Sequence, residues 1–311
     1  MVKFMDYKEI LKQRLSEKRY LHSLAVANEA VRLAVKYGAD EEKAYLSGLL
    51  HDVTKNTPRS EQLKIFRDFG IMLDDVSLNA EKLWHAISGA AYCERVLGIT
   101  DKEILSAIRY HTTAKKDMTL LEKVLYLADF TSADRDYDDV DIMRRLVDES
   151  MEKALDYALS YTIKDLVEQG RQVHPDTMEA YNFVKEKRLM ETKEILKIAA
   201  NALNDKKALD LNAIKVDDLT VLTEYFLMAS ATSSTHVRSL AEEVEFKLSE
   251  SGLEPHHIEG RTTGWILLDY GSVIVHVFNK ESREFYNLDK MWNDGQAVDL
   301  DTILTNEQEK A

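Results

Sequence analysis

The side chains best suited to chemistry are histidines and aspartates of the first 130 residues, in the order His, His-Asp, His, His, Asp. They are His22, His51, Asp52, His85, His111 and Asp129. Apolar residues at helical spacing accompany them, since His22 shares a stripe with Val26 and Asp129 shares one with Leu125. A carboxylate on a stripe that faces the core is costly unless a cation pairs with it. The set therefore points to bound metal ions.

Imidazole and carboxylate ligands suit iron, manganese, cobalt or zinc. Six ligands exceed the needs of one tetrahedral site, and they are enough for two ions that share a carboxylate. Two metals roughly 3.5–4 Å apart would activate water and neutralise a phosphate in line with it. Taken singly, each histidine is more often a core residue with a satisfied hydrogen bond, and the His51-Asp52 doublet alone is a weak signal. The prediction therefore rests on the whole set.

The elements that must position these residues are predicted to be helices. Over residues 1–190 apolar residues recur at helical spacing, Gly38, Gly98 and Gly170 are plausible helix ends, and no alternating strand pattern occurs. The charged stretch 185–188 is expected to end this domain or to form a linker. We predict an all-α domain over residues 1–190.

After about residue 190 the sequence changes character. Short apolar runs at 225–230, 265–270 and 273–278 mix with helical stretches, and the Gly271-Ser272 pair between the last two runs predicts a β-hairpin. Strands mixed with helices indicate a different fold from that of the first half. We predict an α/β mixed-sheet domain over residues 191–311, ending in an acidic tail.

The charge of the chain limits its partners. Lys and Arg number 41 against 55 Asp and Glu, which gives a net charge of −14. Residues 191–311 account for −10 of this, because 12 basic residues face 22 acidic ones there. Binding to a phosphate backbone depends on clustered cations, so no direct DNA binding is expected. A strongly acidic domain is better suited to a basic protein surface.

Other features bear on the compartment. The one cysteine, Cys93, cannot form an internal disulfide, which favours a reducing environment. No apolar run approaches the ~20 residues that a membrane span needs, and the first residues carry no signal-peptide pattern. We expect a cytoplasmic protein that does not contact a membrane.

Short motifs surround the six candidates. They are Arg19-Tyr20-Leu21-His22-Ser23, Leu49-Leu50-His51-Asp52-Val53-Thr54-Lys55, Trp84-His85-Ala86, Arg109-Tyr110-His111-Thr112-Thr113, Leu127-Ala128-Asp129 with Arg135, and His174-Pro175-Asp176-Thr177. Together they resemble the YqeK-type HD-domain phosphohydrolases over about residues 1–190. That resemblance implies an all-helical fold, two metal ions, which are iron in characterised members, and symmetrical cleavage of diadenosine tetraphosphate into two ADP.

The resemblance also implies roles for individual residues. One metal would be held by His22, His51, Asp52 and Asp129, and the second by Asp52, His85 and His111. Lys55 and Arg135 match positions expected to contact phosphate, so the expected catalytic set is Asp52, Lys55 and Arg135. Iron is the expected metal, with manganese, cobalt and zinc as alternatives.

Some alternatives remain open for this domain. The chain departs from the family at Thr131-Ser132-Ala133, where a Glu-Pro pair often precedes the arginine. Arg135 could instead form an ion pair with Asp134, Asp136 or Asp138, and Lys55 could be a solvated surface lysine. The domain could also hydrolyse another nucleotide, or act as a nucleotide sensor without turnover.

The second half carries its own set of motifs. They are Thr223-Glu224-Tyr225-Phe226, Ala231-Thr232-Ser233-Ser234, Glu259-Gly260, Trp265-Ile266-Leu267-Leu268-Asp269-Tyr270-Gly271, Val275-His276-Val277-Phe278, Arg283-Glu284-Phe285-Tyr286 and Leu288-Asp289-Lys290-Met291-Trp292. They resemble the ribosomal silencing factor family (RsfS, Iojap-like) over about residues 193–293. The resemblance implies a nucleotidyltransferase-like α/β fold, binding to the large ribosomal subunit through ribosomal protein L-fourteen, and a block of subunit joining that represses translation.

The sequence agrees with a non-catalytic role for this domain. A nucleotidyltransferase strand carries two carboxylates at alternate positions, but Leu267 lies two residues before Asp269. Aromatic residues in an acidic domain suit contact with a basic ribosomal protein. The predicted partner-binding residues are Trp265, Tyr270, Phe285 and Tyr286. The alternative is that Trp265 and Trp292 are core residues.

Overall fold

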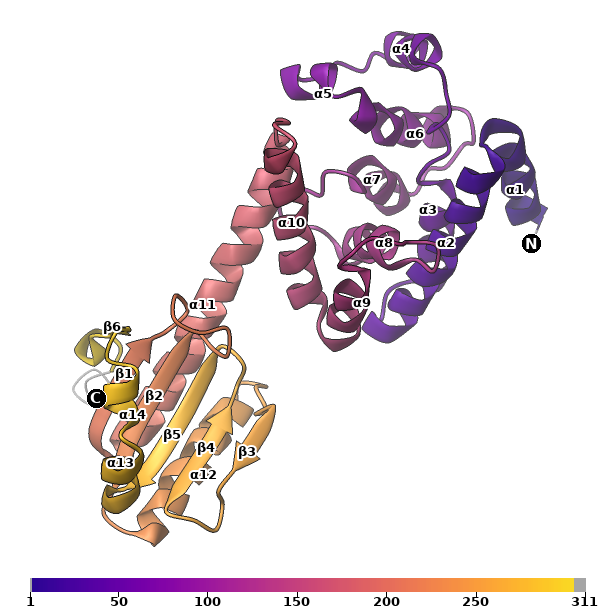
Figure 1. The fold of residues 1–311 in the computed structure, drawn as a ribbon. Helices are drawn as coiled ribbons and strands as arrows, with labels where there is room; N and C mark the ends of the chain where they lie inside the picture. Colours follow the sequence, from indigo (N-terminus) through magenta and orange to yellow (C-terminus); the bar gives the residue numbers. More distant parts are fainter. Residues whose placement is uncertain (1, 305–311) are drawn as a thin grey trace, which may run out of the picture. The chain divides into compact units, whose positions relative to one another are not determined.

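The computed structural model describes residues 2–304, with side chains from Tyr7 onward. This part of the chain divides into two compact units, with the division between residues 186 and 187 (Figure 1). No helix of the described residues is long and apolar enough to cross a membrane. The end of the predicted acidic tail, residues 305–311, lies outside the described part.

The first unit consists of helices, as predicted. They are α1 (Val2–Arg14), α2 (Glu17–Tyr37), α3 (Glu41–Leu50), α4 (Arg59–Asp68), α5 (Asp75–Asn79), the 3₁₀ turn η1 (Glu81–Leu83), α6 (Trp84–Arg95), α7 (Lys102–Tyr110), α8 (Leu120–Thr131), α9 (Val140–Glu149), α10 (Met151–Glu168) and the first part of α11 (Pro175–Asp205). Capping side chains begin several of them. Ser16, Asp40 and Thr119 each accept a hydrogen bond from a backbone N–H in the first turn of α2, α3 and α8.

Helices α2, α3, α7 and α8 pack together around the core of this unit (Figure 1). Leu50, Ile108 and Leu125 are fully buried there. Helices α2 and α3 approach so closely at Gly48 that a Cβ atom there would lie 2.7 Å from Cα of Ala27. This close packing brings the C-terminal end of α3 against its neighbours, and it is at this end that His51 and Asp52 follow.

The second unit contains a six-stranded mixed sheet in the order β3-β4-β5-β2-β1-β6. The strands are β1 (Leu209–Lys215), β2 (Tyr225–Ala231), β3 (His257–Glu259), β4 (Trp265–Asp269), β5 (Val273–Asn279) and β6 (Gln296–Ala297). Strands β2 and β5 pair in parallel, and the other pairs are antiparallel. The antiparallel pairing of β4 with β5 confirms the hairpin predicted at Gly271-Ser272. The mixed sheet with helices confirms the predicted α/β fold.

The two faces of the sheet pack into separate cores. On one face α12 (Ser234–Ser249) and the last part of α11 cover Leu227, Leu268 and Val275. The other face carries a smaller core that includes Phe226 and Phe278. Helices α13 (Lys280–Tyr286) and α14 (Leu288–Met291) follow β5 along the chain.

The charged stretch 185–188, expected to end the first domain or to form a linker, spans the division between the two units at residues 186 and 187. It lies inside α11, which runs without interruption from Pro175 to Asp205. The physical reason is composition, since no glycine or second proline occurs within the helix to end it. Ala180 joins the core of the first unit and Leu196 that of the second, so one helix contributes to both cores.

Candidate metal centre

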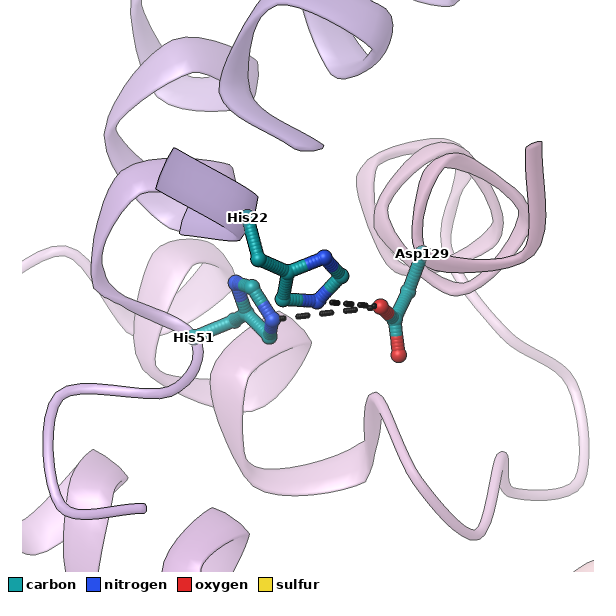
Figure 2. Close-up of side chains that lie close together, drawn as sticks. All are labelled: His22, His51 and Asp129. Atoms are coloured by element: carbon teal, nitrogen blue, oxygen red, sulfur yellow. Dashed lines mark ion pairs between the residues drawn. The ribbon is translucent and has the colours of Figure 1, made fainter. Parts of the chain in front are cut away.

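All six predicted metal ligands converge in the first unit. His22 lies on α2, His51 and Asp52 follow α3, His85 lies on α6, His111 caps α7 and Asp129 lies on α8. The four histidines and Asp52 are each at most 4% exposed. The ligand atoms of His22, His51 and Asp129 lie within 4.8 Å of one another, and so do those of His51, Asp52 and His111. Figure 2 shows His22, His51 and Asp129 turned toward one another. Five helices thus deliver these residues to one place.

Asp52 lies at the centre of this cluster. Its Oδ1 atom is 3.1 Å from Nε2 of His85 and 3.7 Å from Nε2 of His111. Its Oδ2 atom is 3.5 Å from Nε2 of His51 and accepts a hydrogen bond from Nη1 of Arg19 at 3.0 Å. The two carboxylate oxygens therefore face different histidines, which would let Asp52 contribute to two metal sites.

Backbone carbonyls fix the orientation of two of the rings. Nδ1 of His51 lies 2.7 Å from the carbonyl oxygen of Gly48, and Nδ1 of His111 lies 2.7 Å from that of Ile108. A carbonyl can only accept, so Nδ1 carries the proton in the neutral ring. The Nε2 lone pair of each ring then points into the cluster, where it could bind a metal ion.

Several polar atoms of the cluster have no hydrogen-bond partner among the described residues. They include Nε2 of His22, Nε2 of His51 and Oδ1 of Asp52, all fully buried. Leaving a buried polar atom unpaired costs roughly 1–3 kcal/mol, so three together need an explanation. Imidazole and carboxylate donors suit first-row transition metals. The residues present therefore fit a metal centre.

The protonation states of His51, His85 and Asp52 suit metal binding. Burial lowers the pKa of His51 to about 4 and is the main cause of the lowering of the His85 pKa to about 4. Burial opposes ionisation of Asp52, but His51, His111, His85 and Lys55 together hold the pKa of Asp52 well below its usual 3.8. At neutral pH these histidines are neutral and Asp52 is charged, which is the state that binds metal.

Three cations, Arg19, Lys55 and Arg135, border the cluster. Nζ of Lys55 lies 3.0 Å from Nε2 of His85 and 3.7 Å from Oδ1 of Asp52. Arg135 forms an ion pair with Asp129, and its Nε atom also donates to the Asp129 carbonyl oxygen. The aspartate that Arg135 contacts is thus a predicted metal ligand, whereas Asp134, Asp136 and Asp138 were the alternatives expected. Lys55 is half-buried, with its Nζ atom against His85 and Asp52, so it is not a solvated surface lysine.

Two residues at this site were not predicted from the sequence to contact the metal ligands. Arg19, which contacts Asp52, precedes His22 by three residues, and this spacing places both on one face of α2. That signal could have found it. Asp134 lies 2.8 Å from Nδ1 of His22. It comes from the loop after α8, where no helical repeat predicts which way a side chain points.

Comparison with known proteins covers both units. Residues 19–134 match the HD domain family, and residues 189–311 match the family described as ribosomal silencing factor during starvation. The symmetrical bis(5'-nucleosyl)-tetraphosphatase of Bacillus subtilis is 38% identical over 174 residues, which cover 56% of this chain and 93% of that protein. The ribosomal silencing factor RsfS of the same organism is 40% identical over 113 residues, 36% of this chain and 96% of that protein. The chain belongs to both families.

A solved structure supports the first assignment. An HD superfamily hydrolase from Clostridium acetobutylicum, described as involved in NAD metabolism, is 38% identical and superposes with a TM-score of 0.58. The match covers 59% of this chain and 97% of that one. The fusion of an HD domain with an RsfS domain, predicted from the motifs, is therefore confirmed. HD domains bind divalent metals, in keeping with the cluster described above.

The predicted aromatic anchors of the RsfS domain have different surroundings. Phe285 is 82% exposed and Tyr286 is 47% exposed, both on α13. Trp265 is half-buried, with its ring centroid 5.1 Å from that of Phe278 and 4.7 Å from that of Tyr286. It therefore contributes to the smaller core, in keeping with the alternative considered for it.

Tyr270 departs from the expectation. It is buried in the larger core of the RsfS domain, together with Ile266 and Leu268. The cause is strand alternation, since positions 266, 268 and 270 lie on one face and Trp265 and Leu267 on the other. Tyr270 is therefore not on the surface with Phe285 and Tyr286.

Proposed function

We propose that the protein is bifunctional. The first domain, residues 1–190, is a metal-dependent phosphohydrolase that cleaves diadenosine tetraphosphate symmetrically into two ADP. The second, residues 191–311, is a non-catalytic ribosomal silencing factor that binds the large subunit through ribosomal protein L-fourteen and blocks subunit joining in the cytoplasm. The observation that carries the hydrolase proposal is the convergence of six candidate ligands, five of them buried, from five helices. The names of the relatives support the choice of substrate and partner.

The proposed ligand sets share Asp52. His22, His51, Asp52 and Asp129 would hold one ion, and Asp52, His85 and His111 the other, with iron as the expected metal. When bound, such ions stabilise charge that develops on phosphoryl oxygens and lower the pKa of water. At neutral pH His51 and His85 supply neutral imidazoles, and Asp52 an ionised carboxylate, for this purpose.

The chain's own cations would position the substrate. A tetraphosphate bridge carries several negative charges, and the protein is itself acidic, so only local cations can hold it. Lys55, Arg19 and Arg135 all lie against the carboxylates of the cluster and are each about one-third exposed at the side chain. We propose that Lys55 and Arg135 contact phosphate, and that Arg19 adds to the positive charge beside Asp52.

The hydrolase is tested by its products. Full-length protein is incubated with diadenosine tetraphosphate, with and without added iron or manganese, and the nucleotides are separated by anion-exchange chromatography. We expect ADP as the sole product and loss of activity with a chelator. A mixture of ATP and AMP would contradict symmetrical cleavage. Hydrolysis of a different nucleotide in a substrate panel would show that the proposed substrate is wrong. Binding of nucleotide without any hydrolysis would favour a sensor.

The ribosome partner is tested by sedimentation. The RsfS domain presents Phe285 and Tyr286 at the surface of a domain with a net charge of −10, a combination suited to a basic protein. We expect the full-length protein to sediment with large ribosomal subunits and to reduce their association with small subunits. Absence from the large-subunit fraction would contradict this half of the proposal.

A further inference from the structure

His22 is oriented in a different way from His51 and His111. Those two rings direct Nδ1 to a backbone carbonyl three residues earlier on their own helix. Nδ1 of His22 instead lies 2.8 Å from Oδ2 of Asp134, which is 112 residues away in the chain. The orientation of His22 therefore depends on a side chain that the local helix does not supply.

Asp134 is itself held in place. Its Oδ1 atom accepts a hydrogen bond from Oγ of Ser132 at 2.8 Å, which leaves Oδ2 directed at His22. The guanidinium group of Arg144, on α9, donates to the carbonyl oxygens of Ser132 and Arg135, each at 3.1 Å. The loop that carries Asp134 is thus fixed on both sides of the carboxylate.

The opposite edge of the His22 ring faces a second carboxylate. Nε2 of His22 lies 3.1 Å from Oδ1 of Asp129, without the geometry of a hydrogen bond. A neutral imidazole carries one proton, and each carboxylate attracts it to the nitrogen that it faces. If Asp129 prevailed, Nε2 would carry the proton and could not donate a lone pair to a metal. Asp134 acts against this by holding the proton on Nδ1.

We propose that Asp134 is a positioning residue of the metal centre, which accepts the Nδ1–H of His22 and so presents the Nε2 lone pair of His22 to the metal. The inference rests on the proposed metal-dependent function. Carboxylates that orient metal-bound histidines also raise their basicity, and their loss weakens metal binding by about 10–100-fold. Asp134 touches no reacting atom in this account and acts through His22.

The test measures metal binding rather than turnover. Metal-stripped full-length protein is titrated with Mn²⁺, and free Mn²⁺ is followed by electron paramagnetic resonance. We expect Asp134→Ala to weaken one class of bound Mn²⁺ by about 10–100-fold. Asp134→Asn should fall between this variant and the wild type, since the amide oxygen can still accept from Nδ1–H but carries no charge. Asp136→Asn, which changes an exposed carboxylate of the same loop, should bind Mn²⁺ like the wild type.

Further readouts separate positioning from a purely structural role. The melting temperature of the metal-free Asp134→Asn protein should equal that of the wild type, while its Mn²⁺ affinity should not. Equal Mn²⁺ affinity for Asp134→Ala and the wild type would overturn the inference and leave the metal centre intact. Equal losses at all bound Mn²⁺, with a lower melting temperature in both Asp134 variants, would also overturn it. A wild type that binds no Mn²⁺ would instead refute the proposed metal centre.

Discussion

Each domain buries a histidine whose Nε2 atom has no hydrogen-bond partner among the described residues, His51 in the HD domain and His276 in the RsfS domain. Burial lowers the pKa of both to about 4. Their neighbours differ. Nε2 of His51 lies 3.5 Å from Oδ2 of Asp52 and 3.9 Å from Oδ1 of Asp129. The ring of His276 instead packs against the rings of Phe226 and Trp265. Burial and a low pKa therefore do not mark a chemical site; converging carboxylates do.

The two domains also differ in whether their candidate functional residues are buried or exposed. The HD domain concentrates its candidate chemistry in buried polar residues, whereas the RsfS domain exposes Phe285 and Tyr286 and buries apolar residues on both faces of its sheet. We therefore expect loss of a single buried charge to abolish hydrolysis by the HD domain. Loss of an exposed aromatic ring should instead weaken ribosome binding by the RsfS domain. Variants that separate these effects test whether the two functions are independent.

The largest effect is expected at Asp52. Asp52→Asn removes the charge that the cluster shares, so hydrolysis of diadenosine tetraphosphate should fall by roughly 10³-fold or more, the scale seen when a central catalytic group is lost. Steady-state assays of ADP formation measure this. Asp136→Asn is the matched control and should retain activity. Sedimentation of Asp52→Asn with large subunits should be unchanged; undiminished hydrolysis would exclude the cluster as the catalytic centre.

The next effect is expected at the surface of the RsfS domain. Phe285→Ala should weaken sedimentation with large ribosomal subunits by about tenfold to a hundredfold, because exposed aromatic residues are frequent anchors of interfaces. Phe246→Ala is the matched control, since Phe246 is 53% exposed on α12. Both variants should hydrolyse substrate like the wild type. If the two variants sediment equally well, α13 does not form the ribosome contact.

A change at Trp265 is a less specific test of the same surface. Because Trp265 stacks on Phe278 and its Nε1 atom donates to Nδ1 of His276 at 3.2 Å, Trp265→Glu should disturb the smaller core. We expect this variant to lose sedimentation with large subunits together with thermal stability. Circular dichroism melting measures the second loss. Retention of both properties would show that Trp265 neither anchors the partner nor supports the core.

The smallest effect concerns His276 and acid. Burial lowers the pKa of His276 to about 4 in the folded state, against 6.5 when exposed. The unfolded state then takes up the proton first as pH falls. The contribution of neutral His276 to the free energy of unfolding is therefore complete above about pH 6.5, and it is lost progressively as the pH falls toward 4. Between pH 7.5 and 5 this amounts to about 2 kcal/mol of unfolding free energy.

Urea unfolding of the wild type and of His276→Gln, at pH 7.5 and at pH 5, measures the contribution of His276 to the unfolding free energy. The variant should lose less stability on acidification than the wild type, by about 2 kcal/mol. The comparison at each pH removes the contribution of all other titrating groups. Parallel pH dependence of the two proteins would show that His276 does not titrate on unfolding in this range.

The sequence predicted which residues form the cluster but not how they meet. Helical spacing places His22 and Asp129 on buried stripes, whereas their convergence depends on how α2, α3 and α8 pack, to which contacts such as Gly48 against Ala27 contribute. The role of Asp134 was not predictable, because a loop has no periodicity. Nor was the ion pair of Arg135 with Asp129, which depends on the turn that follows α8.

In the RsfS domain the hairpin was predictable because Gly271-Ser272 separates two apolar runs. The burial of Tyr270 could have been predicted as well, since the alternation that separates Trp265 from Ile266 extends to it. Exposure of Phe285 could not, because it depends on where α13 lies against the sheet.

The most direct test of the metal centre is the metal content of the protein. Full-length protein purified without chelator, and the same protein stripped and reloaded with iron or manganese, is analysed by inductively coupled plasma mass spectrometry beside Asp52→Asn. The proposed ligand sets predict about two transition-metal ions per wild-type chain and a clear deficit in the variant. A wild-type chain that retains no iron or manganese after reloading, or an Asp52→Asn protein with undiminished metal, would contradict the account.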